Sequence, residues 1–221
     1  MERVTILCSD PGHPINPVLE AWAGTVAGRA EVRLVRDVAE VGDGDFLFLI
    51  ACQQIVAKPV RDRFDFVLVV HASDLPKGRG WSPLVWQLLE GENDIPVTLL
   101  NAEDGVDSGA VWITERVHFE GIEVHQEIHD RVSRATVALM SWALDNCRSA
   151  QPREQSGEPT YYRKRTPADS ELKPDMTIGE AFDLLRVCDP VRYPAFFDHR
   201  GQRYTLKLER IGPSTAAAEE E

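Results

Sequence analysis

The 221-residue chain has few cysteines, and their spacing suits neither cross-linking nor metal binding. No two of them are separated by only two residues, and the four are Cys8, Cys52, Cys147 and Cys188. Cys8 and Cys52 lie in apolar runs, where a free thiol behaves as a small hydrophobic side chain. The sequence therefore predicts neither a disulfide framework nor a metal site.

Long apolar runs and glycine-rich phosphate loops are also missing. No apolar run reaches the roughly 18 residues that a membrane-spanning helix needs. The opening residues, MERVTILCSD, lack the arrangement of a secretory signal. Phosphate loops of the GxGxxG or GxxxxGKT type are absent, which disfavours nucleotide cofactors bound in those ways. We therefore expect a cytoplasmic protein that does not enter a membrane.

Positive charge is scarce. The 24 lysines and arginines are outnumbered by 36 aspartates and glutamates, which gives a formal net charge of −12. General nucleic-acid binding needs a broad basic surface, so we expect no nucleic-acid partner. An anionic small molecule stays compatible with this charge, because one basic loop can concentrate positive potential locally.

Short apolar runs alternate with helically spaced segments in the first part of the chain. The strands expected there cover residues 4–9, 31–37, 45–52 and 65–71, and the helices cover residues 18–28 and 58–64. This alternation predicts an α/β fold with a Rossmann-like, doubly wound, mostly parallel sheet. A helix at 82–91, strands at 95–103 and 109–119, and a long amphipathic helix at 122–146 follow.

The polar segment 148–160 resembles a linker, so we expect a catalytic domain at 1–150 and a small C-terminal α+β subdomain at 151–212. In this subdomain Thr177 and Glu180 predict a capping box at the start of a helix. A β-hairpin is expected around Arg200 and Gly201. Residues 213–221 are expected to be disordered. The aromatic hairpin could cover its own subdomain or pair with a second chain, and we expect a homodimer.

Three polar loops, SDPGHPIN, VVHASDLPKGRGW and NAEDGVDSG, follow predicted strands. Ligands bind beyond the carboxyl ends of strands in open parallel sheets. His71 ends the most apolar strand, and Asp107 lies in the third loop. A carboxylate beside an imidazole fixes its tautomer and makes a general acid–base pair. Spacing alone favours the plainer alternative, in which His71 caps main-chain carbonyl groups and Asp107 is a turn residue.

Other candidate residues carry weaker signals. His13 lies in a strand-to-helix loop, where helix amides bind phosphate, but an ordinary turn explains it equally well. His125 and His129 share a helix face without a third ligand, which favours surface histidines. The loop Lys77 to Trp81 combines basic and aromatic side chains that suit an anion and a flat ring, with a solvated turn as the alternative.

The motif order from HASDLPKGRGWSPLVWQLLEG to PVTLLNAEDGVDSGAVW resembles the formyltransferase family. That family includes methionyl-tRNA, glycinamide ribonucleotide and sugar N-formyltransferases. The resemblance covers about residues 45–115. The matching positions are His71, Ser73, Leu75, Pro76, Arg79, Gly80, Pro83, Gly91, Val97, Thr98, Asp107 and Gly109.

The later segments YYRKRTPADSEL and YPAFFDHRGQRYTLKL resemble the appended part of sugar N-formyltransferases. The resemblance implies formyl transfer from 10-formyltetrahydrofolate to the amino group of a nucleotide-linked deoxysugar, in the biosynthesis of surface glycans of the pseudaminic type. A methionyl-tRNA formyltransferase-like enzyme is the first alternative, against which the acidic charge stands. A catalytically weak protein that binds folate or a sugar nucleotide is the second.

The resemblance also implies roles for individual residues. His71 would move a proton and Asp107 would orient it. The pterin of the donor would lie against Cys52, Gln53, Gln54, Ile55, Val56, Asp104, Gly105 and Val106. The acceptor would contact Ser9, His13, Asn16, Ser73, Lys77, Arg79, Trp81 and Arg165.

One position departs from the family pattern. The family has an asparagine two residues before the histidine, and this chain has Val69 there. Valine cannot donate a hydrogen bond to an oxyanion, and losing one such donor lowers the rate by about a hundredfold or more. Asn101 and Gln53, near the ends of neighbouring strands, are candidates to replace it.

Overall fold

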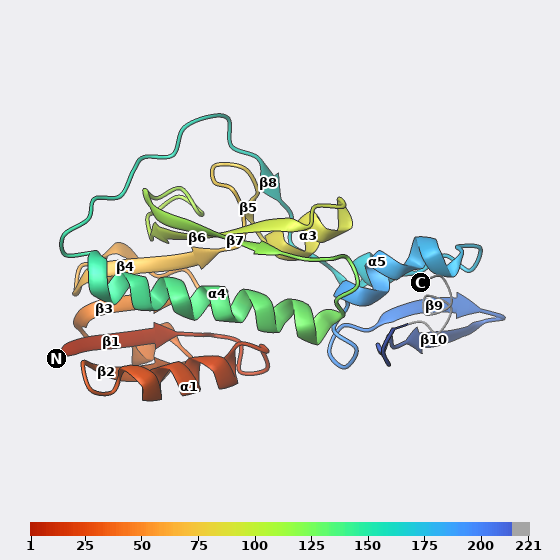
Figure 1. Cartoon of the computed structure of the whole chain (residues 1–221), viewed down its shortest axis with the longest axis horizontal. Helices are drawn as coiled ribbons and strands as arrows, with labels where there is room; N and C mark the ends of the chain where they lie inside the picture. Colours follow the sequence, from red (N-terminus) through yellow and green to blue (C-terminus); the bar gives the residue numbers. More distant parts are fainter. Residues whose placement is uncertain (214–221) are drawn as a thin grey trace, which may run out of the picture. The chain divides into compact units, whose positions relative to one another are not determined.

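The computed structural model describes residues 1–213, which divide into two compact units (Figure 1). The first unit comprises Met1–Gly121 and His129–Arg165. It is built on a six-stranded sheet of order β2-β1-β3-β4-β6-β7. The second comprises Ile122–Ile128 and the described chain from Thr166 onward.

The first half of the chain folds as the alternating pattern predicts. β1, β2, β3 and β4 pair in parallel, which confirms the mostly parallel α/β sheet. The elements are β1 (Glu2–Leu7), α1 (Asn16–Val26), β2 (Ala30–Val35), the 3₁₀ turn η1 (Val38–Glu40), β3 (Gly44–Leu49), α2 (Lys58–Arg61) and β4 (Phe64–His71). β3 and β4 are mostly apolar because both faces of the sheet interior are covered.

The last two strands reverse direction. β6 (Asp94–Asn101) is antiparallel to β4, and β7 (Val111–His118) is antiparallel to β6. Asn101, at the end of β6, therefore lies opposite Leu68 in β4. The short helix α3 (Pro83–Leu89) and the two-residue strand β5 (Arg79–Gly80) connect β4 to β6.

The helix α4 (His125–Asn146) runs along one face of the sheet (Figure 1). Trp142 on α4 lies with its ring centroid 6.4 Å from that of Trp112 on β7. On the same face, Phe46 stacks on Phe66 at 4.9 Å, and Phe66 meets Trp112 edge-on at 6.0 Å. Aromatic packing between helix and sheet thus forms much of the core of this unit.

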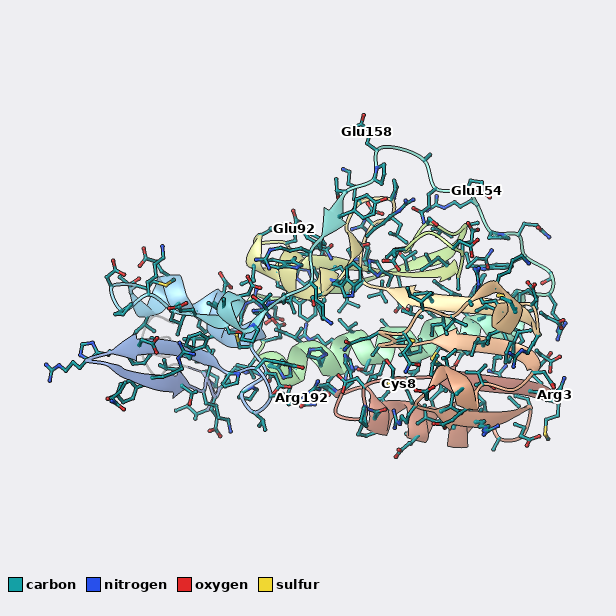
Figure 2. The ribbon with its side chains drawn as sticks, turned by 180° about the vertical axis from the view of Figure 1, so that it is seen from behind. Arg3, Cys8, Glu92, Glu154, Glu158 and Arg192 are labelled. Atoms are coloured by element: carbon teal, nitrogen blue, oxygen red, sulfur yellow. The ribbon has the colours of Figure 1, made fainter. Side chains whose placement is uncertain are left out.

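Residues 151–160, which we call the strap, belong to the first unit together with β8 (Tyr161–Tyr162). Arg153 exchanges two main-chain hydrogen bonds with Val111, of 2.7 and 2.8 Å, and β8 pairs in parallel with β5. Figure 2 shows Glu154 and Glu158 along the strap at the outside of this unit. The segment expected to be a linker is therefore tied to the sheet and to the loop after β4.

The second unit contains the expected helix and hairpin. These are the 3₁₀ turn η2 (Pro167–Ser170), α5 (Ile178–Val187), β9 (Ala195–His199) and β10 (Gln202–Leu206). The capping box is present, since Glu180 N donates to Thr177 Oγ1 at 3.2 Å and Thr177 N donates to a Glu180 carboxylate oxygen at 2.8 Å. The expectation of disorder for 213–221 falls outside the described residues, apart from Pro213. No helix within residues 1–213 is long and apolar enough to cross a membrane.

Substitutions at two glycines would test how closely the chain packs in the first unit. A methyl group on Gly109 would overlap the carbonyl oxygen of Asn101, whereas Gly24 in α1 has open space around it. We expect Gly109→Ala to lower the free energy of unfolding by about 1–3 kcal/mol through overpacking. Gly24→Ala should raise it by roughly 0.5–1 kcal/mol, because alanine loses less backbone entropy in a helix. Guanidinium unfolding measures both, and an unchanged midpoint for Gly109→Ala would contradict the close approach.

Candidate functional site

His71 is the last residue of β4, and its ring is 7% exposed. The parallel strands β1, β3 and β4 end at the same edge of the sheet, where ligands bind in open α/β folds. The buried strand fixes the position of the ring, and the residues that follow it form the wall of the site.

Asp107 meets His71 across this edge. Its Oδ2 atom lies 3.4 Å from Nδ1 of the imidazole, and its side chain is 11% exposed. Because β6 is antiparallel, its loop starts beside the middle of β4, where Ala102 N donates to Val67 O at 2.8 Å. The loop then folds back toward His71, and Asp107 adopts a left-handed backbone conformation with φ 49°. The two loops converge as expected, although by a reversed strand.

The second ring nitrogen of His71 also has a partner. Nε2 lies 2.8 Å from the carbonyl oxygen of Gly78. The ring is therefore held between a carboxylate and a main-chain carbonyl group, which unites the two alternatives that the sequence left open. Both partners can only accept hydrogen bonds, so these contacts fix the position of the ring, and its catalytic role stays a prediction.

The loop after β4 needs its glycines. Gly78 has φ 71° and donates its N–H to Thr160 Oγ1 at 2.8 Å. Gly80 has φ 100°, and a side chain there would overlap the carbonyl oxygen of Tyr162. Its N–H donates to Oδ2 of Asp107 at 2.9 Å. Glycine thus lets β5 approach β8 closely and present an amide to the carboxylate.

The basic and aromatic side chains of this loop point to different surroundings. The Arg79 guanidinium bonds Oε1 of Gln155 through Nε at 3.2 Å and Nη2 at 2.6 Å. Lys77 is exposed, and Trp81 is 46% exposed. Ser73 is buried, and its hydroxyl oxygen has no hydrogen-bond partner within residues 1–213. Lys77 and Trp81 are thus accessible from solvent, and Arg79 is accessible in part.

The loop after β1 is held mainly by hydrogen bonds between its own residues. Asn16 is buried and donates from its amide to the carbonyl groups of Asp10, Pro11 and His13. Nδ1 of His13 accepts from Ile15 N at 3.2 Å. These contacts shape the loop, and an acceptor-binding role for Asn16 and His13 stays a prediction.

The segment expected to hold the pterin follows β3. Ile55 is 92% exposed, and within residues 1–213 the main chain of Ile55 and Val56 makes no hydrogen bond. The main chain of Gln53 donates to Ser9 Oγ at 2.8 Å, which joins this loop to the one after β1. Gln54 turns its side-chain oxygen to Val38 N at 2.8 Å. An exposed apolar side chain beside unpaired amides suits a flat, hydrogen-bonding heterocycle.

The second segment expected to hold the pterin, residues 104–106, is linked to the first through α2. Arg61 donates to the carbonyl group of Ala102 at 2.8 Å and forms an ion pair with Asp104. Val106 is 51% exposed, and Gly105 O accepts from Ser108 Oγ at 2.9 Å. Both segments therefore present apolar side chains to solvent while α2 holds one near the other.

Asn101 does not replace the family asparagine. It lies opposite Leu68, and its Oδ1 accepts from Trp112 Nε1 at 2.7 Å on the face that α4 covers. Val69 and His71 alternate with Leu68 and so point to the opposite face. The side chain of Gln53 is exposed, and its oxygen lies 3.5 Å from Nζ of Lys164. Gln53 therefore remains a candidate, and Asn101 is excluded by the register.

Trp86, Tyr162, Arg163 and Gln155 were not predicted from the sequence, whereas Arg165 was. Trp86 on α3 stacks on Tyr162 at 6.4 Å, with the Arg163 guanidinium 4.7 Å and that of Arg165 6.0 Å from the Trp86 ring centroid. Burial and the Glu90 carboxylate, which accepts from the hydroxyl at 2.6 Å, raise the pKa of Tyr162. The aromatic and basic run YYRKR, residues 161–165, was the sequence signal that could have indicated this cluster. The sequence held no signal for Gln155, because a lone glutamine in a polar segment forms no recognisable pattern.

No cluster of three or more His, Cys, Asp or Glu side chains suited to a metal ion occurs in the part of the chain that the structure describes. The candidate site is an imidazole–carboxylate pair at the sheet edge, where the segment after β3 carries an exposed apolar side chain and the loop after β4 carries basic and aromatic ones.

The formyl transferase family model matches residues 14–144, so the chain belongs to this family. Two curated relatives are both named methionyl-tRNA formyltransferase. The one from Finegoldia magna is 32% identical over 113 residues, which are 51% of this chain and 36% of the relative. The one from Citrifermentans bemidjiense is 30% identical over 154 residues, 67% of this chain and 48% of the relative. The chain thus spans half or less of the length of these relatives.

Solved structures share the fold at low identity. A methionyl-tRNA formyltransferase from Clostridium thermocellum has a TM-score of 0.83 and 20% identity, covering 96% of this chain and 94% of that chain. A sugar N-formyltransferase from a Shewanella species has a TM-score of 0.73 and 16% identity, covering 97% and 100%. HypX from Aquifex aeolicus, in complex with tetrahydrofolic acid, has a TM-score of 0.73 and 17% identity, covering 94% and 37%.

The thiol of Cys52, in the first segment expected to hold the pterin, offers a direct test of the burial of this segment. Burial raises the pKa of Cys52, and burial raises the pKa of Cys147 to about 12. A raised pKa leaves less thiolate at a given pH, so Cys52 should be alkylated by iodoacetamide at pH 8 more slowly than an unfolded thiol. Its rate should still increase above pH 9. Cys147, which is 3% exposed, should react only after unfolding. Mass spectrometry follows both, and rapid labelling of Cys52 at pH 7 would contradict this environment.

Proposed function

We propose that the protein transfers a formyl group from 10-formyltetrahydrofolate to the amino group of a nucleotide-linked amino deoxysugar. The observation that carries this proposal is the 3.4 Å contact between His71 and Asp107 at the sheet edge of a formyl transferase family member. The pair is flanked by surfaces of different chemistry, as a reaction between two different substrates requires.

Binding of the folate donor is supported by the features of two segments, Cys52–Val56 and residues 104–106. Ile55 and Val106 offer exposed apolar side chains, and the main chain of Ile55 and Val56 leaves hydrogen-bonding groups unpaired within residues 1–213. These features fit a pterin, and the fold neighbour HypX has been solved with tetrahydrofolic acid. The donor supplies the formyl group, and the chain binds and orients it.

The reaction forms a bond between the acceptor nitrogen and the formyl carbon and breaks the bond to the donor nitrogen. The attacking amine must be neutral, and it loses a proton as the new bond forms. Once Nε2 of His71 exchanges the Gly78 carbonyl oxygen for the amine, it accepts that proton and returns one to the leaving nitrogen, while Asp107 orients the ring through Nδ1 and stabilises it when it is charged. The main-chain amides nearby are candidates to stabilise the developing oxyanion.

The acceptor side is supported by the loop after β4. On this loop Lys77 and Trp81 are exposed and suit a phosphate group and a flat ring, while Arg79 is partly exposed with its guanidinium bonded to Gln155. The Arg165 guanidinium lies near the Trp86 ring. A sugar nucleotide is favoured over tRNA because a net charge of −12 opposes the many phosphate contacts of an RNA partner. Methionyl-tRNA is the second candidate acceptor, favoured by the names of the two curated relatives.

Purified protein should consume 10-formyltetrahydrofolate in the presence of a UDP-, GDP-, CMP- or dTDP-linked 4-amino deoxysugar, as followed by mass spectrometry of the sugar. His71→Ala and Asp107→Asn should lower kcat by about a hundredfold to ten-thousandfold, because proton transfer loses its acceptor or its orientation. His118→Ala is the matched control, since His118 is 66% exposed and pairs with Asp94 on the surface.

Formylation of methionyl-tRNA without formylation of any sugar nucleotide would replace the proposed acceptor with the second candidate. Full activity of both His71→Ala and Asp107→Asn would overturn the proposed chemistry. Tight folate binding in a thermal-shift assay without turnover of any amine would instead identify a binding protein, since a ligand stabilises the folded state by mass action.

The missing asparagine yields a separate prediction. Val69 lies on the same strand face as His71, and a donor there would face the reacting carbonyl group. Val69→Asn should raise kcat about tenfold or more, because one oxyanion donor contributes on the order of a hundredfold. Val69→Leu, which adds bulk without a donor, is the control. An unchanged kcat in Val69→Asn would show that another group already supplies this hydrogen bond.

A further inference from the structure

Gln155, in the middle of the strap, makes four hydrogen bonds with its side-chain amide. The oxygen Oε1 accepts from Nε and Nη2 of Arg79 at 3.2 and 2.6 Å. The nitrogen Nε2 donates to the carbonyl oxygens of Asp107 and Gly109, each at 2.8 Å. Arginine can only donate and carbonyl oxygens can only accept, so this network fixes which way the amide points.

The loop that carries Asp107 depends on these contacts. Its residues 103–106 are exposed, and Asp107 holds a left-handed conformation that a non-glycine residue adopts at an energetic cost. Within residues 1–213, Asp107 is tethered by Gly80 N on its carboxylate and by Gln155 on its carbonyl oxygen. The contact with His71 is longer, at 3.4 Å.

The two hydrogen bonds that hold Asp107 come from residues that are connected to each other. Gly80 follows Arg79 in β5, and Arg79 is itself held by Gln155. Gln155 therefore links β5, whose Gly80 amide binds the Asp107 carboxylate, to the loop that carries Asp107. Removing the amide would release the main chain of Asp107 and loosen Arg79 at the same time.

We propose that Gln155 is a positioning residue, which sets the Asp107 carboxylate against His71 and acts on the reaction only through that pair. This role rests on the proposed formyl transfer. A displacement of about 1 Å in a reacting group can cost about a hundredfold in rate. Gln155→Ala should accordingly lower kcat about 10- to 100-fold, with the KM for the folate donor changed less than about threefold.

Gln151→Ala is the matched control, because Gln151 is the same residue type in the same strap and is exposed. Its kcat should equal that of the parent protein. Gln155→Glu separates the two halves of the amide: it keeps an acceptor for Arg79 but places a carboxylate oxygen against two carbonyl oxygens. Gln155→Glu should therefore lose at least as much kcat as Gln155→Ala. The proposal would be overturned if Gln155→Glu kept its kcat and only Gln155→Ala raised the KM for the acceptor. That result would mean that Gln155 orients Arg79 and does not position Asp107.

A double-mutant cycle tests whether Gln155 acts through Asp107. If it does, Gln155→Ala should lower kcat less than about twofold in an Asp107→Asn background, since contacting residues are not additive. The pH–rate profiles of Gln155→Ala and Asp107→Asn should also change shape in the same direction. A purely structural defect would multiply the two losses and lower the rate equally at every pH, and either result would overturn the proposal.

One measurement is independent of turnover. Hydrogen exchange of peptides covering 102–110 should be faster in Gln155→Ala than in Gln151→Ala, while exchange in β4 stays unchanged. Unchanged exchange across 102–110 would overturn the positioning role whatever the activity. If the parent protein formylates no acceptor but this loop still responds to Gln155→Ala, the proposed function fails while the structural link stands.

Discussion

The contact between Nδ1 of His71 and Oδ2 of Asp107 is the constraint around which the larger unit is arranged. The imidazole is placed by a buried strand, which leaves it little freedom. The carboxylate arrives on a loop that must fold back from an antiparallel strand, and its backbone is left-handed at that point. The ring is therefore located by the core, whereas the acid is located by the contacts of its loop.

Several of those contacts come from parts of the chain distant in sequence. Gly80 supplies an amide because its missing side chain lets β5 lie close to Tyr162 of β8. The strap brings Gln155, and the aromatic stack of Trp86 on Tyr162 brings the arginines that follow. An acidic protein thus carries neighbouring arginines beside an aromatic stack.

The sequence predicted the sheet, the capping box of α5 and the hairpin because each has a local signal in apolar periodicity, side-chain spacing or turn residues. It predicted that the loops of His71 and Asp107 would converge from their polar composition and from family resemblance. It did not predict the direction of β6, since strand direction depends on pairing between distant segments. For the same reason Asn101 was a plausible donor until its pairing with Leu68 turned it to the other face.

The strap illustrates a similar limit, because its polar, proline-containing sequence is typical of a linker, yet it bonds to β7 and β5. The side-chain amide of Gln155 connects it to the loop that carries Asp107. An insertion or deletion between Arg153 and Thr160 would therefore displace Gln155 from the carbonyl oxygens of Asp107 and Gly109.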